Sequence, residues 1–357
     1  MKISDIADII NVTEKDPSNC GIDVFVGLEH YDIAELVIKR FGSTKMLTTA
    51  TKKFEAGDVL IARRNVYLQR ASVARFSGLT SGDSIVLRVK KNLSSEKTDY
   101  DAMCQLLPFI LNSINFWDYA NTNADGTMSK RLSPAILQEY EFDLPSIEEQ
   151  KVLAEKLWAA YEVKQSYLKM IAATEEMVKS QFVEMFGDTH LKSESCRQWK
   201  EVVEIINGKD YKSIKVEEGG YPVYGTGGEM ARASDYLSPA NSILLGRKGT
   251  IDKPLLVKEK YWNVDTAFGA VPDENVLNYI YFYWHCKTID FNVLNKGTTL
   301  PSTTKVDLLN LWVKIPGMEE QNRFASIVEQ ADKSISELRK SIDAIDKVIK
   351  SLINENL

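Results

Sequence analysis

Two long stretches of the chain place apolar residues at alternating steps of three and four, which is typical of helices that pair in a coiled coil. The later stretch keeps this spacing at Phe324, Val328, Ala331, Ile335, Leu338, Ile342, Ile345, Ile349 and Leu352. The earlier stretch keeps it at Leu157, Tyr161, Leu168, Ile171, Val178, Phe182 and Met185. Lys164 and Glu175 interrupt the earlier seam, where we expect the helix to be frayed or contacted by another chain. Because such a seam must be covered, we predict an antiparallel helix pair; the alternative is that each helix packs alone on its own domain.

The same short motif precedes each of the two helices. LPSIEEQ at Leu144–Gln150 recurs as IPGMEEQ at Ile315–Gln321, 171 residues later. In the first copy, Ser146 and Glu149 have the spacing of a capping box, and Gly187 suits the left-handed residue that ends a helix. The motif residues expected to serve helix pairing or partner contacts are Glu148, Glu149, Gln150, Glu319, Glu320 and Gln321.

Other segments recur in the same order, so the chain is predicted to be a duplication. Ile9–Asn11 recurs as Ile205–Asn207, and Val59–Arg64 resembles Ile243–Lys248. The offset falls along the chain from 196 to 184 to 171, so the first copy is the longer one. We therefore expect four parts: globular domains at residues 1–144 and 188–315, and helical spacers at residues 145–187 and 316–357.

Short apolar segments bounded by turns predict strands in both globular domains. The clearest are Val59–Ala62, Ser84–Val89, Ser242–Leu245 and Pro254–Val257. Each domain also has a helical aromatic segment, at Cys104–Tyr119 and Asn278–Cys286. The run YIYFYW at Tyr279–Trp284 is interpreted as a buried helix face, with base stacking as the alternative. The predicted fold class is α+β: two globular domains joined by a pair of long antiparallel coiled-coil helices, in an internal pseudo-twofold duplication.

Charge narrows the function classes further. The chain has 357 residues, with 44 Lys and Arg against 50 Asp and Glu, and a formal net charge of −6. That balance excludes a uniformly basic nucleic-acid coat, so any nucleic-acid surface must be a local patch. Residues 54–91 are such a patch, because they hold seven basic residues against three acidic ones.

The sequence lacks the motifs of common catalytic sites. It has no Gly-Lys-Ser/Thr phosphate loop and no Gly-x-Ser-x-Gly elbow, and its three histidines are not at metal-ligand spacing. The four cysteines lie far apart, which argues against a zinc knuckle or disulfide scaffold and suits a reducing cytoplasm. No apolar run approaches the roughly 18 residues of a membrane span. We expect a cytoplasmic protein with no metal or cofactor of its own and no membrane contact.

Two pairs of loops carry basic and hydroxyl residues at comparable positions in the two copies. Arg63–Asn65 and Gly246–Thr250 each follow a predicted strand, and second loops follow downstream at Asn123–Arg131 and Lys296–Lys305. Such side chains contact phosphates, and an Arg at a loop tip can read guanine. The alternative interpretation is solvated loops with ordinary charges. The DNA-binding candidates are Arg63, Arg64, Asn65, Tyr67, Arg70, Lys130, Arg131, Arg247, Lys248, Thr250, Lys296, Thr298, Thr299, Ser302, Thr303 and Lys305.

Over essentially its whole length, the chain resembles the specificity subunit of a type I restriction–modification enzyme. The resemblance rests on the two motifs at Leu144–Gln150 and Ile315–Gln321 and on the helix that ends at Phe186-Gly187-Asp188. Looser similarities lie at Phe25–His30, at Gly57–Leu60 with Arg63-Arg64, and at Gly246–Thr250.

The resemblance implies two target recognition domains that each read one half of a bipartite sequence in double-stranded DNA, held apart by a paired helical spacer. It also implies two modification subunits, docked through the helical regions, that carry an S-adenosylmethionine-dependent adenine methyltransferase. Restriction subunits that use ATP and Mg²⁺ would complete the nuclease, while this chain is a non-catalytic subunit.

Two alternatives remain open at this stage. The chain could be the DNA-reading subunit of a methylation-only or other phage-defence system, which only the neighbouring subunits would distinguish. It could also be a coiled-coil adaptor whose end domains bind proteins, in which case phosphate contacts would be missing.

Overall fold

The computed structural model describes residues 1–95, 97–127, 129–190, 192–297 and 300–357. The chain forms two compact units: unit 1 contains Met1–Tyr167 and Lys340–Leu357, and unit 2 contains Leu168–Arg339. Each unit therefore combines one globular part with a segment of each long helix. Within the described residues, no helix is both long and apolar enough to cross a membrane.

Unit 1 is built on a four-stranded antiparallel sheet. Its strands, in spatial order, are β1 (Ala7–Ile9), β9 (Ser84–Val89), β6 (Val59–Ala62) and β7 (Ala71–Val73). Helices α2 (Tyr100–Ile110) and α3 (Ile114–Asn123) pack on one face, where they share a core with this sheet. The predicted strands at Val59–Ala62 and Ser84–Val89 are confirmed residue for residue.

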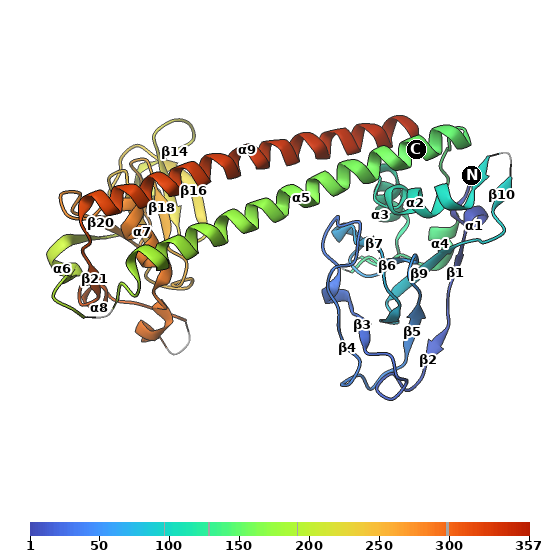
Figure 1. Ribbon diagram of the computed structural model, residues 1–357, viewed down its shortest axis with the longest axis horizontal. Coiled ribbons are helices and arrows are strands. Elements are labelled where there is room, and N and C mark those ends of the chain that lie inside the picture. Colours follow the sequence, from blue (N-terminus) through green and yellow to red (C-terminus); the bar gives the residue numbers. More distant parts are fainter. Residues whose placement is uncertain (96, 128, 191, 298–299) are drawn as a thin grey trace. The chain divides into compact units, whose positions relative to one another are not determined.

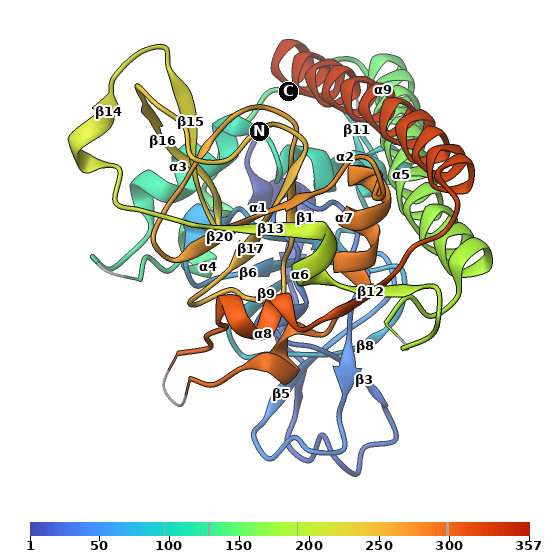
Figure 2. The same ribbon diagram turned by 90° about the vertical axis from the view of Figure 1, so that its left-hand side faces the viewer.

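A second sheet covers the other face of β6 and β9. Its strands, in spatial order, are β2 (Thr13–Glu14), β5 (Thr51–Phe54), β8 (Gly78–Thr80), β3 (Val24–Val26) and β4 (Gly42–Ser43). Both views place it on the far side of the first sheet from α2 and α3 (Figure 1 and Figure 2). Val59 and Ile61 enter the helix-side core, while Leu60 and Ala62 enter the core between the sheets. This two-sided burial explains why β6 is apolar at every position.

Unit 2 repeats the strand order of the first sheet, whereas its second sheet has four strands in place of five and pairs them in a different order. Its first sheet has, in spatial order, β13 (Val203–Asn207), β20 (Ala267–Pro272), β17 (Ser242–Gly246) and β18 (Leu255–Val257). Its second sheet has β14 (Lys215–Val216), β16 (Gly228–Ala233), β15 (Tyr221–Gly225) and β19 (Trp262–Asn263). Helix α7 (Tyr279–Thr288) buries Ile280, Tyr281, Phe282 and Trp284, so the interpretation of YIYFYW as a core face is confirmed.

Shorter elements complete the two units. Those of unit 1 are α1 (Ile3–Ile6), η1 (Leu28–His30), η2 (Val66–Leu68), β10 (Ser94–Ser95), β11 (Thr98–Asp99) and α4 (Pro134–Gln138). Those of unit 2 are β12 (Cys196–Gln198), α6 (Trp199–Val202), η3 (Lys212–Ile214), η4 (Phe291–Leu294), α8 (Lys305–Leu309) and β21 (Trp312–Lys314). The helical segment expected at Cys104–Tyr119 consists of two helices, because the hydroxyl of Ser113 accepts from the Phe116 N–H and caps a new helix there.

The long helices begin and end as the motif predicts. Helix α5 spans Ile147–Phe186 and α9 spans Met318–Asn356. The Ser146 N–H donates to the Glu149 carboxylate at 3.0 Å, and the Glu149 N–H donates back to the Ser146 hydroxyl at 3.5 Å. The Ser146 hydroxyl also donates to the Glu149 carboxylate at 2.7 Å, and this bond, together with the one from the Ser146 N–H, lowers the pKa of Glu149. After the helix, Gly187 has φ = +64° and donates its N–H to Val183 O at 2.8 Å, as a left-handed C-terminal residue does.

Segments of α5 and α9 lie side by side within each unit. In unit 1 the first part of α5 meets the last part of α9, since Leu157 and Tyr161 share a core with Ile353. In unit 2 the last part of α5 meets the first part of α9, with the Phe182 and Phe324 rings 5.2 Å apart. The helices are therefore antiparallel in both units, as predicted.

The two charged interruptions of the seam are paired rather than frayed, which corrects that expectation. Lys164 Nζ lies 2.6 Å from the Asp346 carboxylate in unit 1. In unit 2, Glu175 lies 3.8 Å from the Arg339 guanidinium. Leu168 lies between Lys164 and Glu175 in the sequence and is 41% exposed, so the apolar seam is poorly buried there.

Candidate nucleic-acid interface

The two candidate loops of unit 1 lie side by side. The first follows β6 and the second precedes α4, so the fold returns the chain to the same edge of the sheet. The Asn65 N–H donates to Lys130 O at 2.9 Å, and the Leu132 N–H donates to Arg63 O at 3.0 Å. The sequence placed these loops 60 residues and more apart, and backbone hydrogen bonds join them into one surface.

Unit 2 joins its loops at the same register. The Gly249 N–H donates to Pro301 O at 2.9 Å, and the Thr303 N–H donates to Arg247 O at 3.0 Å. Gly249 has φ = +84°, and its counterpart Asn65 has φ = +56°, so both turns need a left-handed residue. Gly and Asn are the residues that adopt this conformation at least cost.

Unit 1 concentrates positive charge around a single acid in the turn between β8 and β9. Asp83 lies 2.7 Å from Arg64 Nε and 3.1 Å from Arg131 Nη2. Lys52 donates from Nζ to Ser84 O at 2.8 Å. Burial, with the neighbouring Arg63 guanidinium, lowers the pKa of the Lys52 ammonium. Arg63 donates from Nε to Leu132 O at 3.1 Å. Two arginines thus pair with the Asp83 carboxylate, with Lys52 and Arg63 nearby, so the cluster carries a net positive formal charge.

The other unit 1 candidates divide between anchored and exposed side chains. Arg70 donates from Nη1 to Leu28 O and from Nη2 to Arg64 O, both at 3.0 Å, and its burial lowers its pKa. Lys130 donates from Nζ to a backbone carbonyl in α3. Tyr67, in contrast, is 63% exposed beside the loop. Arg70 and Lys130 therefore hold the loops in place, while Tyr67 faces solvent.

In unit 2 the first loop leaves two polar side chains open. Arg247 is partly committed, because its Nη1 donates to Asp265 O at 3.2 Å and its guanidinium lies 5.8 Å from the Phe268 ring centre. Lys248 and Thr250 are exposed, and neither side chain makes a hydrogen bond to any residue that the structure describes. These two residues are the accessible polar groups of that loop.

Most of the candidate side chains in the second loop of unit 2 are bonded to other parts of the unit. Lys296 pairs with the Asp307 carboxylate of α8 at 2.6 Å and lowers its pKa. Thr303 is buried and donates its hydroxyl to a β17 carbonyl at 2.8 Å, so this hydroxyl has no route to a phosphate. Lys305 donates from Nζ to a β13 carbonyl at 2.6 Å. Ser302 is half-buried beside them, and two candidates lie outside the described residues, Thr298 and Thr299.

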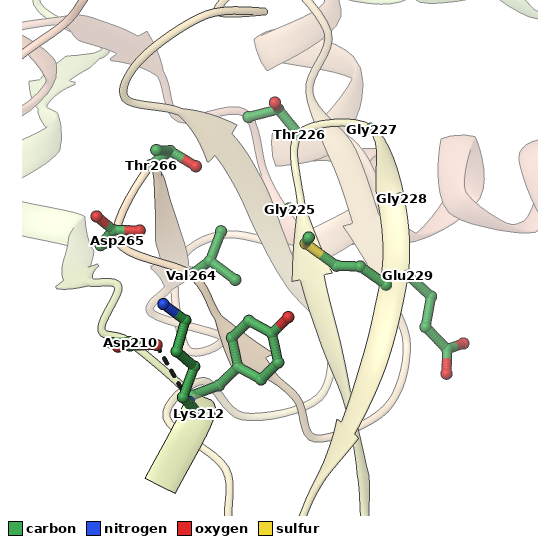
Figure 3. Close-up of a pocket in the computed structure, with 12 residues that line it drawn as sticks. Asp210, Lys212, Gly225, Thr226, Gly227, Gly228, Glu229, Val264, Asp265 and Thr266 are labelled. Carbon is green, nitrogen blue, oxygen red and sulfur yellow. Dashed lines mark hydrogen bonds between the residues drawn. The ribbon is translucent and has the colours of Figure 1, made fainter. Parts of the chain in front are cut away.

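A cavity of about 590 Å³ borders the first loop of unit 2, and sequence reasoning missed it. It lies between the hairpin turn at 225–228 and the turn at 264–266, with Lys212 extending toward Val264 (Figure 3). The Arg247 N–H donates to Thr266 O at 2.9 Å, so the loop and the cavity share a wall. Its charged lining consists of the Asp210 and Asp265 carboxylates, the Lys212 ammonium and Glu229, which pairs with Arg232 at 2.9 Å. Carboxylates repel phosphates, but they accept hydrogen bonds from base amino groups.

The glutamine of each repeated motif has a role that sequence reasoning also missed. Gln150 and Gln321 are fully buried, and each donates from Nε2 to the proline carbonyl five residues upstream. Each also donates to a carbonyl just before the domain's own helix, at Lys97 (2.9 Å) and at Val276 (3.0 Å). Gln321 Oε1 additionally accepts from the Asn278 N–H at 2.8 Å. The motif therefore joins each long helix to its globular part.

The remaining motif residues and part of α5 face outward. The four acids of the motifs, Glu148, Glu149, Glu319 and Glu320, are exposed. Helix α5 also exposes apolar side chains, three of them at seven-residue spacing: Val163, Met170 and Met177. Exposed apolar groups in a regular row are typical of surfaces that bind another protein.

Comparisons with known proteins agree with this organisation. Residues 195–347 match the family described as the type I restriction modification DNA specificity domain. Over 120 residues the chain is 23% identical to the type I restriction enzyme MjaVIII specificity subunit of Methanocaldococcus jannaschii. That match covers 33% of this chain and 25% of the relative, so it spans about a quarter of the relative's length.

Two solved structures share the fold over nearly the whole chain. The type I restriction–modification S subunit from M. genitalium has a TM-score of 0.63 at 14% identity, covering 99% of this chain and 94% of that one. A chain from a structural study of complex assembly and conformational transition of the type I R-M system has a TM-score of 0.57 at 16% identity, covering 99% and 96%. Residues 195–347 are thus similar in sequence to the type I restriction modification DNA specificity domain, and the chain as a whole shares its fold with the solved S subunit.

Proposed function

We propose that the chain is the DNA-reading subunit of a type I restriction–modification complex and that each unit reads one half of a bipartite target. The observation that carries the proposal is the pair of loops joined at the same backbone register in both units. A surface built twice on one scaffold, with different side chains each time, is what reading two different half-sites requires.

The charge of the two surfaces supports contact with DNA. In unit 1, Lys52, Arg63, Arg64 and Arg131 gather around Asp83, which suits phosphates and guanine edges. In unit 2 the cavity is lined by carboxylates and by the exposed Lys212. The carboxylates suit base amino groups, and the lysine suits a phosphate nearby. Because the chain has a net charge of −6, its attraction for DNA must come from these local patches.

The helices offer the surface for partner subunits. Exposed motif acids and the apolar row on α5 fit two modification subunits, which would supply S-adenosylmethionine and the adenine methyltransferase. Restriction subunits with ATP and Mg²⁺ would join the same assembly. This chain itself would be non-catalytic and would act in the cytoplasm, beside the DNA that it reads.

Salt-dependent binding tests the proposal. The complex of this chain with its modification subunits is titrated with a labelled duplex library at several salt concentrations. Each phosphate contact would lower the affinity about threefold between 50 and 200 mM salt, so a surface with several such contacts would show a clear salt dependence. A complex that binds duplex DNA without salt dependence, or binds none, would favour a protein adaptor and contradict the proposal.

A further inference from the structure

The side chains of Arg64, Asp83 and Arg131 meet at the candidate interface of unit 1. Counting the charges in each loop does not predict this arrangement. The Asp83 carboxylate holds Arg64 with one oxygen at 2.7 Å and Arg131 with the other at 3.1 Å. About half of the Arg64 side chain and 42% of the Arg131 side chain remain exposed. Arg70 fixes the backbone of Arg64 by donating to its carbonyl. Both guanidinium groups are thus held in place and still open to solvent.

The repeat identifies the position in unit 2 that corresponds to Asp83. The Arg63 N–H donates to Asp83 O at 2.9 Å, and the Arg247 N–H donates to Thr266 O at the same distance. In both units the acceptor directly precedes the strand that pairs with the first loop's strand. Thr266 therefore occupies the place of Asp83.

The two arginines have counterparts in the same way. Arg64 forms an antiparallel backbone bridge with Arg131, and Lys248 forms the same bridge with Ser302. An Arg–Asp–Arg trio in unit 1 thus becomes a Lys–Thr–Ser trio in unit 2. The backbone and the net charge of +1 are kept, while all three side chains change together. Positions that change together on a kept scaffold are where two readers would differ in what they recognise.

We propose that Asp83 is a positioning residue that holds Arg64 and Arg131 for reading guanine, and that the corresponding trio in unit 2 sets a different preference. The proposal deepens the proposed function and rests on it. Contact through Nε leaves Nη1 and Nη2 of Arg64 for a second partner, and two such donors match guanine O6 and N7. Holding the side chain in advance reduces the entropy lost on binding. The unit 1 half-site therefore contains guanine.

Methylated-site mapping tests the assignment in the complete complex. N6-methyladenine is sequenced in cells that carry the modification subunits with wild-type chain or with Arg64→Ala, Arg131→Ala, Asp83→Asn or Lys248→Ala. Arg64→Ala and Arg131→Ala each relax the guanine preference in one half-site, about tenfold or more for a bidentate contact. Asp83→Asn relaxes the same half-site, and Asp83→Glu restores part of the preference. Lys248→Ala changes only the other half-site.

The matched control is Asp32→Asn, which removes a carboxylate that pairs with Arg40 at 2.7 Å elsewhere in unit 1. It should leave both half-sites and the melting temperature unchanged. An Asp83→Asn chain that melts lower but keeps its half-site intact would show a merely structural role and overturn the proposal. A bipartite wild-type target without guanine in the unit 1 half would also overturn it, while leaving the proposed function standing. If the wild-type chain directs no methylation, both this proposal and the proposed function are contradicted.

Discussion

The buried glutamines of the two motifs provide a matched pair of substitutions inside one chain. Gln321→Leu keeps the side-chain volume roughly constant but removes three hydrogen bonds, to Val276 O, to the Pro316 carbonyl and from the Asn278 N–H. Gln150→Leu removes only two. It also removes a buried Oε1 that has no partner among the described residues. We therefore expect the two changes to differ in cost.

The difference follows from the count of bonds. At about 1 kcal/mol for each net hydrogen bond, Gln321→Leu costs unit 2 about 3 kcal/mol. Gln150→Leu loses about 2 kcal/mol and recovers about 1 by removing an unsatisfied group, a net cost of about 1 kcal/mol to unit 1. The ratio of unfolded to folded unit then rises about 150-fold in the first case and about fivefold in the second.

Hydrogen exchange measured by mass spectrometry separates the two units, which a single melting curve does not. Peptides from β17 report opening of unit 2, and peptides from β6 report opening of unit 1. Gln321→Leu should accelerate exchange in β17 about 150-fold and Gln150→Leu should accelerate it in β6 about fivefold. Equal effects, or a larger effect of Gln150→Leu, would refute this account of the motif.

Three further predictions concern stability. Burial, followed by the neighbouring His190, lowers the pKa of His285 well below its usual 6.5. The unfolded chain then takes up a proton that the folded chain does not, so stability falls below pH 6.5 by up to about 1.4 kcal/mol per pH unit for this group. Burial also lowers the pKa of His190, so urea unfolding of His285→Gln should show a smaller slope that is not zero. Gly249→Val, at φ = +84°, should destabilise unit 2 by about 1–2 kcal/mol and Gly249→Asn much less, as hydrogen exchange in β17 peptides would report. Asp58→Asn breaks a two-bond pair with the partly exposed Arg88 and should cost about 2 kcal/mol in urea unfolding, whereas a cost near zero would contradict a stabilising role.

The sequence predicted correctly the elements that depend on interactions between residues close together in the chain. The capping box at Ser146, the glycine after Phe186 and the fully apolar strand at Val59–Ala62 are all found where the pattern predicts them. The loop pairs were also predictable, because the first loop of each pair follows the corresponding strand of the first sheet, whose strand order is the same in both units. Hydrophobic spacing and repetition therefore account for the architecture.

The sequence alone did not predict which residues far apart in the chain contact one another. Asp83 is one of three acids among the seven basic residues of segment 54–91, and only the fold shows that its carboxylate holds Arg64 and Arg131. The commitment of Thr303 and Lys305 to backbone carbonyls depends on strands that lie 57 and 100 residues away. Their residue types suit phosphate contact equally well, so a single sequence could not separate the two roles.

We propose that the two units read one DNA molecule and that the lengths of α5 and α9 set the gap between the two half-sites. Inserting one heptad into both helices, after Tyr167 in α5 and after Arg339 in α9, keeps the seam in phase and adds about 10 Å. Insertion into α5 alone, which breaks the pairing, is the control and should abolish reading. Methylated-site sequencing of the double insertion should show both half-sites unchanged and a gap longer by about 3 base pairs. An unchanged gap, or altered half-sites, would contradict the account.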